Sequence, residues 1–515
     1  MASSFSRIEI SPMRSLLALA TASMVSSVVL GQVGLAAAQQ AVQFPFALTH
    51  EGQMLGAVEG EVASFKGLAY AAAPLGLLRW RAPEALPESS EMRTAYDFGP
   101  ACLQPAMPHA SEDCLTLNVF RPFGVDGPLP VMVFFHDGGF VTGTANDPLL
   151  DGAKLAQAGI IVVTVNYRLG VFGWLAHPSL AVNAPDGASA NYGMMDQIAA
   201  LRWVHDNAAA FGGDPGNVTL FGSGSGATSI ALLMLCPQAR ELFHKAILQS
   251  LPARQGVPSL QEAEAIGQRV FSLVARDRST SDPRALDTRM LLAAETLLFA
   301  KSARSFGPVL DGRLVTEDIA SGFGAAHESR IPVIIGSNED ETSFVGEPDL
   351  KEELRLAGES ADRLKALYPG ISGKPAELAA RLYTDRIFTE PARYLARLHA
   401  ATGAPTYRYR FSYMGEAQRA NGDGGHGREL QFVFGAQGVP GASPFTRADR
   451  ELAGQLRSYW TNFARTGDPN GPGLPPWDAS SQGERLLLIS NDGIASRDDP
   501  LSGPLDHLER RSPRG

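Results

Sequence analysis

A glycine-rich turn between an apolar run and a helical pattern is the first place where residue types and spacing point to chemistry. The segment reads Val218-Thr219-Leu220-Phe221-Gly222-Ser223-Gly224-Ser225-Gly226-Ala227. Small residues around a sharp strand-to-helix turn are typical of a nucleophile elbow, which exposes one side chain above a sheet. A phosphate-binding loop is the alternative, but no Gly-Lys-Ser/Thr word is present. The pattern therefore favours the elbow.

A second glycine-rich loop follows another apolar run upstream. It reads His136-Asp137-Gly138-Gly139-Phe140, directly after residues 131–135. Backbone N–H groups in such a loop can point at a developing oxyanion, because glycine lets the substrate approach closely. Alone, this word is a weak signal, since most loops of this kind are only turns. Together with the elbow it indicates a site that stabilises negative charge on oxygen.

The elements that must position these loops are short apolar strands. The runs are too short for helices and are rich in β-branched residues, at positions 131–135, 160–165, 218–221, 246–248 and 333–335. Helical patterns lie between several of them, most clearly from Asp196 to Phe211. Strands buried on both faces that alternate with helices predict an α/β fold with a mostly parallel central sheet and helices on both faces.

The flanking regions complete the expected domain. Residues 42–70 predict a short N-terminal β segment with a hairpin at Glu59-Gly60, and residues 260–298 and 350–401 read as largely helical. The alternation from Tyr407 to Tyr413 is that of a half-exposed strand.

The domain boundaries follow from composition. We expect a single domain over residues 39–498, because no composition break or linker marks a second one. The polar residues 499–515 predict a mobile C-terminal tail.

The N-terminus has the pattern of a signal peptide over residues 1–38. Arg7 and Arg14 precede an apolar stretch that ends in Ala36-Ala37-Ala38, a small-residue cleavage pattern, and Met13 would make a tidier start than Met1. The alternative is a membrane anchor or a buried N-terminal helix. The cleavage pattern favours a secreted or periplasmic protein with no membrane span in the mature chain.

Composition narrows the partners and the redox chemistry. The net charge is −10 and no Lys/Arg-rich run is present, which argues against nucleic acid as a partner. Cys102 and Cys114 enclose a short loop that a disulfide could close outside the cytosol, leaving Cys236 over; three reduced thiols are the alternative. No Cys-x-x-Cys or His-Glu-x-x-His word indicates a metal site.

Further words along the chain resemble one known family. They are Ser111-Glu112-Asp113-Cys114-Leu115-Thr116-Leu117-Asn118-Val119, Asn166-Tyr167-Arg168-Leu169-Gly170-Val171-Phe172-Gly173, Asp196-Gln197, Phe211-Gly212-Gly213-Asp214-Pro215 and Trp460-Thr461-Asn462-Phe463-Ala464. With the two glycine loops, they resemble the type-B carboxylesterases, the cholinesterase-like branch of the α/β-hydrolases. The resemblance runs from about residue 42 to 490 and implies the α/β-hydrolase fold.

The resemblance also implies roles for particular residues. The oxyanion hole would be the backbone of Gly138, Gly139 and Ser225, the triad acid Glu341 and the triad base His426. Taken alone, His426 would be a surface histidine and Glu341 one carboxylate of an acidic loop. Further matches assign Ser250 to the support of the acid, with a plain strand-end hydroxyl as the alternative, and assign two structural ion pairs, Arg79 with Glu112 and Arg168 with Asp196.

The chain departs from the family at the nucleophile. Where the family has Gly-Glu-Ser-Ala-Gly, this chain has Gly222-Ser223-Gly224-Ser225-Gly226, so Gly224 stands in the place of the serine. Shifting the alignment by one residue would place Ser225 at the nucleophile position. Such a shift is unfavourable, because moving a strand by one residue turns its side chains to the opposite face. Glycine offers no atom that could attack an ester carbonyl.

Three explanations could reconcile Gly224 with an active site. Ser223 or Ser225 could reach His426 in another conformation of the turn, or a water molecule in the space of the missing side chain could be activated by His426. The third is an artefact of sequencing or engineering.

Two functions remain open from the sequence. The first is a carboxylic ester hydrolase (EC 3.1.1 class) acting through an acyl-enzyme, with weak or lost activity because of Gly224. The second is a non-catalytic, cholinesterase-like binding protein, a pseudoenzyme. The resemblance implies a small neutral carboxylic ester or ester-like ligand, but no choline site, because the loop from Cys102 to Cys114 lacks a tryptophan. It implies no cofactor, and the sequence carries no signal of an oligomeric state.

Overall fold

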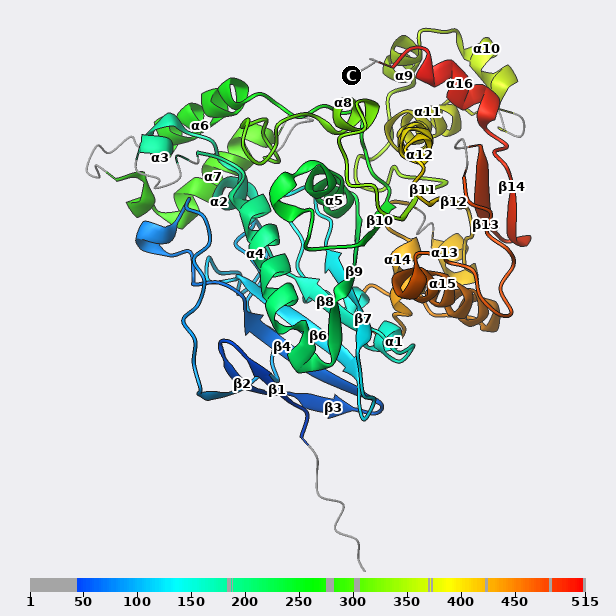
Figure 1. The fold of residues 1–515 in the computed structure, drawn as a ribbon. Helices are drawn as coiled ribbons and strands as arrows, with labels where there is room; N and C mark the ends of the chain where they lie inside the picture. Colours follow the sequence, from blue (N-terminus) through cyan, green and yellow to red (C-terminus); the bar gives the residue numbers. More distant parts are fainter. Residues whose placement is uncertain are drawn as a thin grey trace, which may run out of the picture. The chain divides into compact units, whose positions relative to one another are not determined.

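The predicted strands form the interior of one large sheet in the computed structural model. The structure describes residues 44–182, 187, 189–274, 282–300, 306–368, 371, 374–421, 425–480 and 484–512. Within these residues the sheet has eleven strands in the order β14-β13-β12-β11-β10-β9-β7-β8-β6-β4-β3 (Figure 1). Their bounds along the chain are β3 (Ala57–Glu59), β4 (Val62–Ala69), β6 (Thr116–Pro122), β7 (Leu129–Phe135), β8 (Ile161–Val165), β9 (Gly213–Ser223), β10 (Lys245–Gln249), β11 (Val333–Asn338), β12 (Thr406–Phe411), β13 (Arg485–Ser490) and β14 (Gly493–Asp498).

The middle of the sheet is parallel and its edges are antiparallel. Strands β8, β7, β9, β10, β11, β12 and β13 pair in parallel, one after another. Strands β3, β4 and β6 at one edge and β14 at the other pair antiparallel. A second, small sheet holds β1 (Phe46–Thr49), β2 (Gly52–Leu55) and β5 (Met92–Thr94). The α/β-hydrolase fold expected from the sequence is confirmed, including the mostly parallel sheet.

Alternate side chains of each interior strand enter two different cores. On β7, Val133 packs into a core with α4 and α5, whereas Phe134 packs into a core with α15 on the other face. Helices therefore cover both faces of the sheet, which explains why the strands read as continuous apolar runs. The helices are α1 (Ala153–Ala156), α2 (Gly170–Trp174), α3 (Pro178–Val182), α4 (Tyr192–Asn207), α5 (Ser225–Leu235), α6 (Leu260–Val274), α7 (Thr288–Phe299), α8 (Ile319–Gly324), α9 (Leu350–Ala357), α10 (Ala361–Leu367), α11 (Pro375–Thr384), α12 (Glu390–Ala401), α13 (Glu416–Asn421), α14 (Glu429–Phe434), α15 (Arg447–Thr466) and α16 (Ser502–Glu509).

Strand β12 corrects one expectation from the sequence. Its alternation of aromatic and polar residues predicts a half-exposed strand, but all six residues are buried between β11 and β13. The two arginines are tolerated inside because each meets a carboxylate: Arg408 bonds Asp499 at 2.6 Å and Arg410 bonds Glu339 at 3.3 Å. Ion pairing therefore substitutes for solvent on the polar face of this strand.

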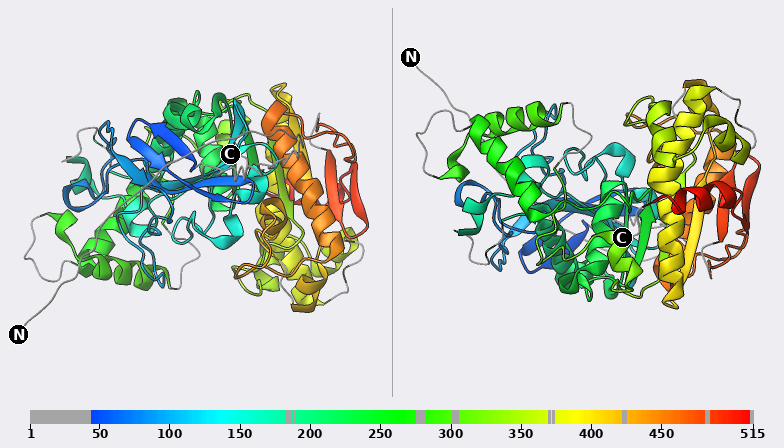
Figure 2. Two further views of the ribbon diagram at one scale, coloured as in Figure 1. Left: turned by 90° about the horizontal axis from the view of Figure 1, so that it is seen from below. Right: turned by 90° about the horizontal axis from the view of Figure 1, so that it is seen from above.

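The C-terminal segment corrects a second expectation. The polar tail predicted to be mobile contains α16, which packs with α9, α10 and α11 at one end of the sheet (Figure 2). Leu501, Leu505 and Leu508 are all buried there. Their spacing of four and three residues is the apolar stripe of an amphipathic helix, a signal that the polar composition obscures.

Residues 44–515 form one compact unit. The predicted signal peptide at residues 1–38 lies outside the described residues. No helix in the described part of the chain is both long and apolar enough to cross a membrane.

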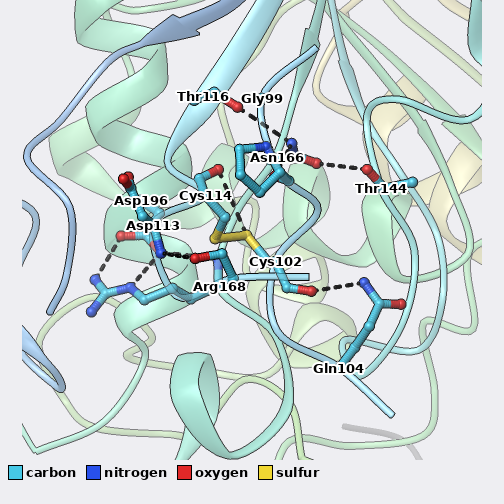
Figure 3. The surroundings of a disulfide bond; sticks show 12 residues. Gly99, Cys102, Gln104, Asp113, Cys114, Thr116, Thr144, Asn166, Arg168 and Asp196 are labelled. Carbon is cyan, nitrogen blue, oxygen red and sulfur yellow. Dashed lines mark hydrogen bonds and ion pairs between the residues drawn. A yellow bond between two sulfur atoms is a disulfide. The ribbon is translucent and has the colours of Figure 1, made fainter. Parts of the chain in front are cut away.

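The disulfide loop supports the glycine-rich loop after β7. Cys102 and Cys114 are bonded to each other (Figure 3). Cys236 is buried as a free thiol. Within that loop, the Gln104 amide donates to the backbone oxygen of Gly143 at 2.7 Å and accepts from its N–H at 2.9 Å. The side chain thereby fixes the far end of the glycine-rich loop.

Two bidentate ion pairs hold neighbouring loops. The Arg79 guanidinium donates to Glu112 at 2.7 and 2.6 Å, and the Arg168 guanidinium donates to Asp196 at 2.7 and 2.6 Å. Asp196 is fully buried, and Arg168 is almost so (Figure 3). Both pairs link segments that are distant in sequence, as expected of structural ion pairs.

Candidate active site

Five neighbouring parallel strands deliver the candidate residues to one edge of the sheet. Asp137 follows β7, Gly224 follows β9, Ser250 follows β10, Glu341 follows β11 and His426 follows β12. Because parallel strands end at the same edge, these loops meet there. The topology alone thus brings together residues separated by up to 289 positions in the sequence.

The turn at Gly224 has the sharp geometry expected of an elbow. The end of strand β9 leads directly into α5 (Figure 1). Strand β9 ends at Ser223 and α5 begins at Ser225, while Gly224 between them has φ 53° and ψ −115°. This left-handed conformation disfavours residues with a Cβ atom. Gly226 is required for close packing, since a Cβ there would lie 2.0 Å from the carbonyl oxygen of Phe135. The flanking glycine lets the turn approach β7.

Glu341 and His426 form a tightly bonded pair. The Nδ1 atom of His426 lies 2.6 Å from Oε2 of Glu341, which is fully buried. Oε1 of the same carboxylate accepts a bond of 2.7 Å from the Ser250 hydroxyl and one of 2.6 Å from the Asn338 N–H. Each carboxylate oxygen therefore has its own donors, which fix the side chain toward the imidazole.

A second buried carboxylate, Glu429, lies behind this pair. Its oxygens accept bonds of 2.7 Å each from the side-chain amides of Gln249 and Asn338. Burial, together with the nearby charge of Glu341, raises the pKa of Glu429. The Asn338 amide also donates to the Ser250 hydroxyl at 3.3 Å, so the network connects Glu429 to the support of Glu341.

The carboxylate of Asp137 occupies the space beside Gly224. A Cβ atom built at residue 224 would lie 2.3 Å from Oδ1 and 2.6 Å from Oδ2 of Asp137. Oδ2 lies 2.9 Å from the Nε2 atom of His426. The imidazole thus meets a carboxylate on each nitrogen, and Asp137 takes the contact that a serine hydroxyl would make in the family arrangement.

The other oxygen of Asp137 binds the donors assigned to the oxyanion hole. Oδ1 accepts from the Ser225 N–H at 2.8 Å and from the Ser225 hydroxyl at 3.0 Å, with the Gly139 N–H more distant at 3.5 Å. The expected donors therefore converge on one point, and that point holds a carboxylate of the protein itself.

The charges at this site stabilise one another. Burial raises the pKa of Asp137, but the His426 charge and hydrogen bonds from His426, Ser225 and Gly138 outweigh it and hold that pKa well below its usual range. Burial lowers the pKa of His426, but the carboxylates of Glu341 and Asp137 outweigh it and raise that pKa well above its usual value. Both shifts favour a protonated His426 beside an ionised Asp137.

Neither of the two serines considered as substitute nucleophiles has its hydroxyl directed to His426. The Ser225 hydroxyl is directed to Asp137, and the Ser223 hydroxyl is fully buried without a hydrogen-bond partner among the described residues. Neither hydroxyl bonds His426 in the described part of the chain. The aromatic rings of Phe344 and Phe388 lie 5.0 and 5.2 Å from the imidazole and give the site an apolar wall.

Two site residues, Asp137 and Glu429, were not identified from the sequence. Asp137 is the acidic residue of His136-Asp137-Gly138-Gly139, and Glu429 follows His426 by three positions. The available signal for Asp137 was a carboxylate in one glycine-rich loop together with glycine at the nucleophile position of the other. Glu429 carries no signal until the pairing of β10 and β11 places Gln249 and Asn338 beside it.

Comparisons with known proteins point to one family. The model of the carboxylesterase family matches residues 43–364 and 372–499. The chain is 35% identical over 449 residues to fumonisin B1 esterase of Sphingopyxis macrogoltabida, with 82% of each chain covered. It is 34% identical over 487 residues to para-nitrobenzyl esterase of Bacillus subtilis (strain 168), covering 88% of this chain and 96% of that one. A solved carboxylesterase of Geobacillus stearothermophilus superposes with a TM-score of 0.79 at 32% identity, covering 91% of this chain and 100% of that one.

Proposed function

The chain belongs to the carboxylesterase family, and from that premise we propose that its site binds small carboxylic esters but turns them over weakly or not at all. Gly224 stands in the place of the nucleophilic serine, while Glu341 and His426 are the acid–base pair. The observation that carries the proposal is the Asp137 carboxylate, which lies 2.9 Å from His426 and would lie within 2.3 Å of a Cβ at residue 224.

Electrostatics argue against the acyl-enzyme route. A general base must be neutral to accept a proton, whereas the two carboxylates favour the protonated form of His426. The donors of Gly139 and Ser225 are engaged by Asp137, so a developing oxyanion would meet a negative charge there. Loss of a triad nucleophile costs on the order of 10⁶-fold in turnover, and part of the remaining catalysis depends on a free oxyanion hole.

The same observations argue against the two rescue routes by which the site could act without a serine at position 224, namely attack by another serine and attack by water. Attack by the Ser225 hydroxyl would require it to leave Asp137 and reach His426, and attack by water would require a neutral His426. Both routes therefore begin with the displacement of Asp137. The second candidate function, an ester-like ligand bound without turnover, is favoured by this same occupied site.

We also propose export of the protein, on the basis of the N-terminal pattern.

Hydrolysis of a short-chain p-nitrophenyl ester tests the proposal. The native protein, His426→Ala and the control His327→Ala, which changes an exposed histidine, are compared under equal conditions. We expect native turnover close to that of His426→Ala. Rapid turnover by the native protein and His327→Ala, abolished in His426→Ala, would show a working rescue route and refute the proposal.

A further inference from the structure

The two oxygens of Asp137 have different surroundings, and this asymmetry suggests a chemical role. Oδ1 is held by the Ser225 N–H and hydroxyl, whereas Oδ2 has the single contact with His426 Nε2 among its described hydrogen bonds. The side chain is 30% exposed, so solvent or a small molecule can approach it. A partly exposed carboxylate whose one oxygen is held by an N–H and a hydroxyl, and whose other oxygen is bonded only to an imidazole, is arranged as a nucleophile.

We propose that Asp137 is a catalytic nucleophile for the hydrolysis of epoxides to diols. Oδ2 attacks a carbon of the strained ring, a new Oδ2–C bond forms, and the ring C–O bond breaks. The ring oxygen takes the proton from Nε2 of His426, so the product of this step is a hydroxyalkyl ester of Asp137 beside a neutral imidazole. The step balances without any other reactant.

The second step uses the groups that an esterase needs. A water molecule gives a proton to the neutral His426 and its oxygen adds to Cγ of Asp137. The Cγ–Oδ2 bond then breaks, and the diol leaves with Oδ2 and with the proton from His426. The remaining carboxylic acid proton of Asp137 passes to His426, which restores the starting charges. The sum is one epoxide and one water converted to one diol.

The position of Oδ1 supports this second step. In the aspartyl ester Oδ1 is the carbonyl oxygen, and it becomes the oxyanion when water adds to Cγ. The Ser225 N–H at 2.8 Å is already placed at this oxygen, with the Gly139 N–H at 3.5 Å. Preorganised donors of this kind stabilise the charge where it develops. The oxyanion hole thus serves an ester of the protein rather than an ester of the substrate.

The charge state of the site favours an epoxide over a carboxylic ester as the partner of Asp137. A strongly ionised carboxylate is a weak nucleophile toward an unactivated acyl group, and the donors of Ser225 already face Oδ1 of Asp137 rather than an acyl oxyanion. An epoxide relieves ring strain on opening and needs a proton at its oxygen, which the imidazolium supplies. Loss of the Asp137 charge on alkylation then lowers the pKa of His426 toward the neutral form that the second step requires.

A single-turnover experiment in H₂¹⁸O with p-nitrostyrene oxide and excess native protein tests the proposal. Because water attacks Cγ of Asp137, the first diol should contain ¹⁶O from the protein, and the peptide with Asp137 should gain one ¹⁸O atom. Asp137→Asn should reduce diol formation at least about 100-fold, whereas Asp113→Asn, an exposed control, should not change it.

Two results would overturn the proposal. One is diol formation by the native protein no faster than by Asp137→Asn. The other is a first diol that carries ¹⁸O while Asp137 remains unlabelled, which would show direct attack of water on the epoxide. The isotope measurement uses the native chain, so it does not depend on the folding of a variant. Neither result bears on p-nitrophenyl ester turnover, which is measured separately.

Discussion

The two halves of the proposed site differ in how closely they match the arrangement that the family resemblance implies. The acid–base half, formed by Ser250, Glu341 and His426, is complete: each oxygen of Glu341 has a donor, and the imidazole contacts it at 2.6 Å. In the nucleophile half, Gly224 offers no attacking atom, and the carboxylate of Asp137 lies against it. One loop has no side chain, and the other places a carboxylate in the adjacent space.

The two residues of the nucleophile half depend on each other. A Cβ at residue 224 would lie 2.3 Å from Oδ1 of Asp137, so the position of Asp137 requires glycine there. The Asp137 carboxylate in turn bonds His426 Nε2 and the donors of Ser225. The intact acid–base half supports a site that still needs a positioned imidazole, as the epoxide proposal requires.

The largest expected effect comes from changing both positions together, so that residue 224 carries the serine and residue 137 no longer obstructs it. We expect Asp137→Gly combined with Gly224→Ser to raise p-nitrophenyl ester turnover by roughly 10⁴-fold or more over the native protein. Gly224→Ser alone should gain little, because its Cβ would lie 2.3 Å from Oδ1 of Asp137. Asp137→Gly alone lacks the nucleophile. Equal activity of Gly224→Ser and the double variant would show that Asp137 does not obstruct the site.

The second-largest effect is expected from a change of Glu341 made in the double variant Asp137→Gly and Gly224→Ser. Glu341→Gln should lower kcat by roughly 10⁴-fold with little change in KM, because the amide no longer holds the imidazole in the correct state. Asp340→Asn is the control, since it alters the neighbouring carboxylate of the same acidic loop, which bonds Thr342 instead. A similar loss in both variants would mean that Glu341 has no special role.

Stability should depend on pH through the contact between the two halves. The raised pKa of His426 adds stability that is present below pH 6.5 and is lost as pH rises through its folded-state value. The lowered pKa of Asp137 adds stability that is present above pH 3.8 and is lost as pH falls through its folded-state value. Both contributions are present between pH 3.8 and 6.5.

Urea denaturation of the native protein and Asp137→Asn measures this dependence. At pH 5.5 we expect Asp137→Asn to be less stable by about 2 kcal/mol, the scale of a hydrogen bond to a charged group. The difference should shrink as pH rises through the folded-state pKa of His426. A difference that grows with pH would contradict the assigned charges.

The smallest effect should come from the support of the acid. Ser250→Ala, made in the double variant Asp137→Gly and Gly224→Ser, removes one of the two donors to Oε1 of Glu341. It should lower kcat about tenfold, equivalent to about 1.4 kcal/mol. Ser272→Ala, which changes an exposed helical serine, should leave kcat unchanged. No effect of Ser250→Ala would favour its role as a plain strand-end hydroxyl.

The sequence predicts the sheet better than the periphery. The interior strands β7 to β11 are evident because burial on both faces leaves continuous apolar runs. The exposure of strand β12 was predicted wrongly, because Arg408 and Arg410 are buried and form ion pairs with carboxylates from distant segments. Helix α16 was missed because its three spaced leucines stand in a polar segment. The apolar surface that they pack against is formed by α9, α10 and α11, which the local sequence does not show.

The site shows the same limit. The positions of Gly224, Glu341 and His426 could be inferred from words along the chain, and the structure brings these loops to one edge of the sheet. The role of Asp137 could not be inferred, because it depends on which of its oxygens faces Ser225 and which faces His426. Such a contact spans 289 positions and leaves no local pattern in the sequence.

The titration of His426, followed by NMR of the labelled imidazole, tests the central claim most directly. The claim is that the Asp137 carboxylate stands in the place of the serine and holds His426 as an imidazolium. We predict that His426 in the native protein remains protonated at pH values well above 6.5, and that Asp137→Asn lowers its pKa. A native His426 that is neutral at pH 7, with the same titration in Asp137→Asn, would contradict the claim.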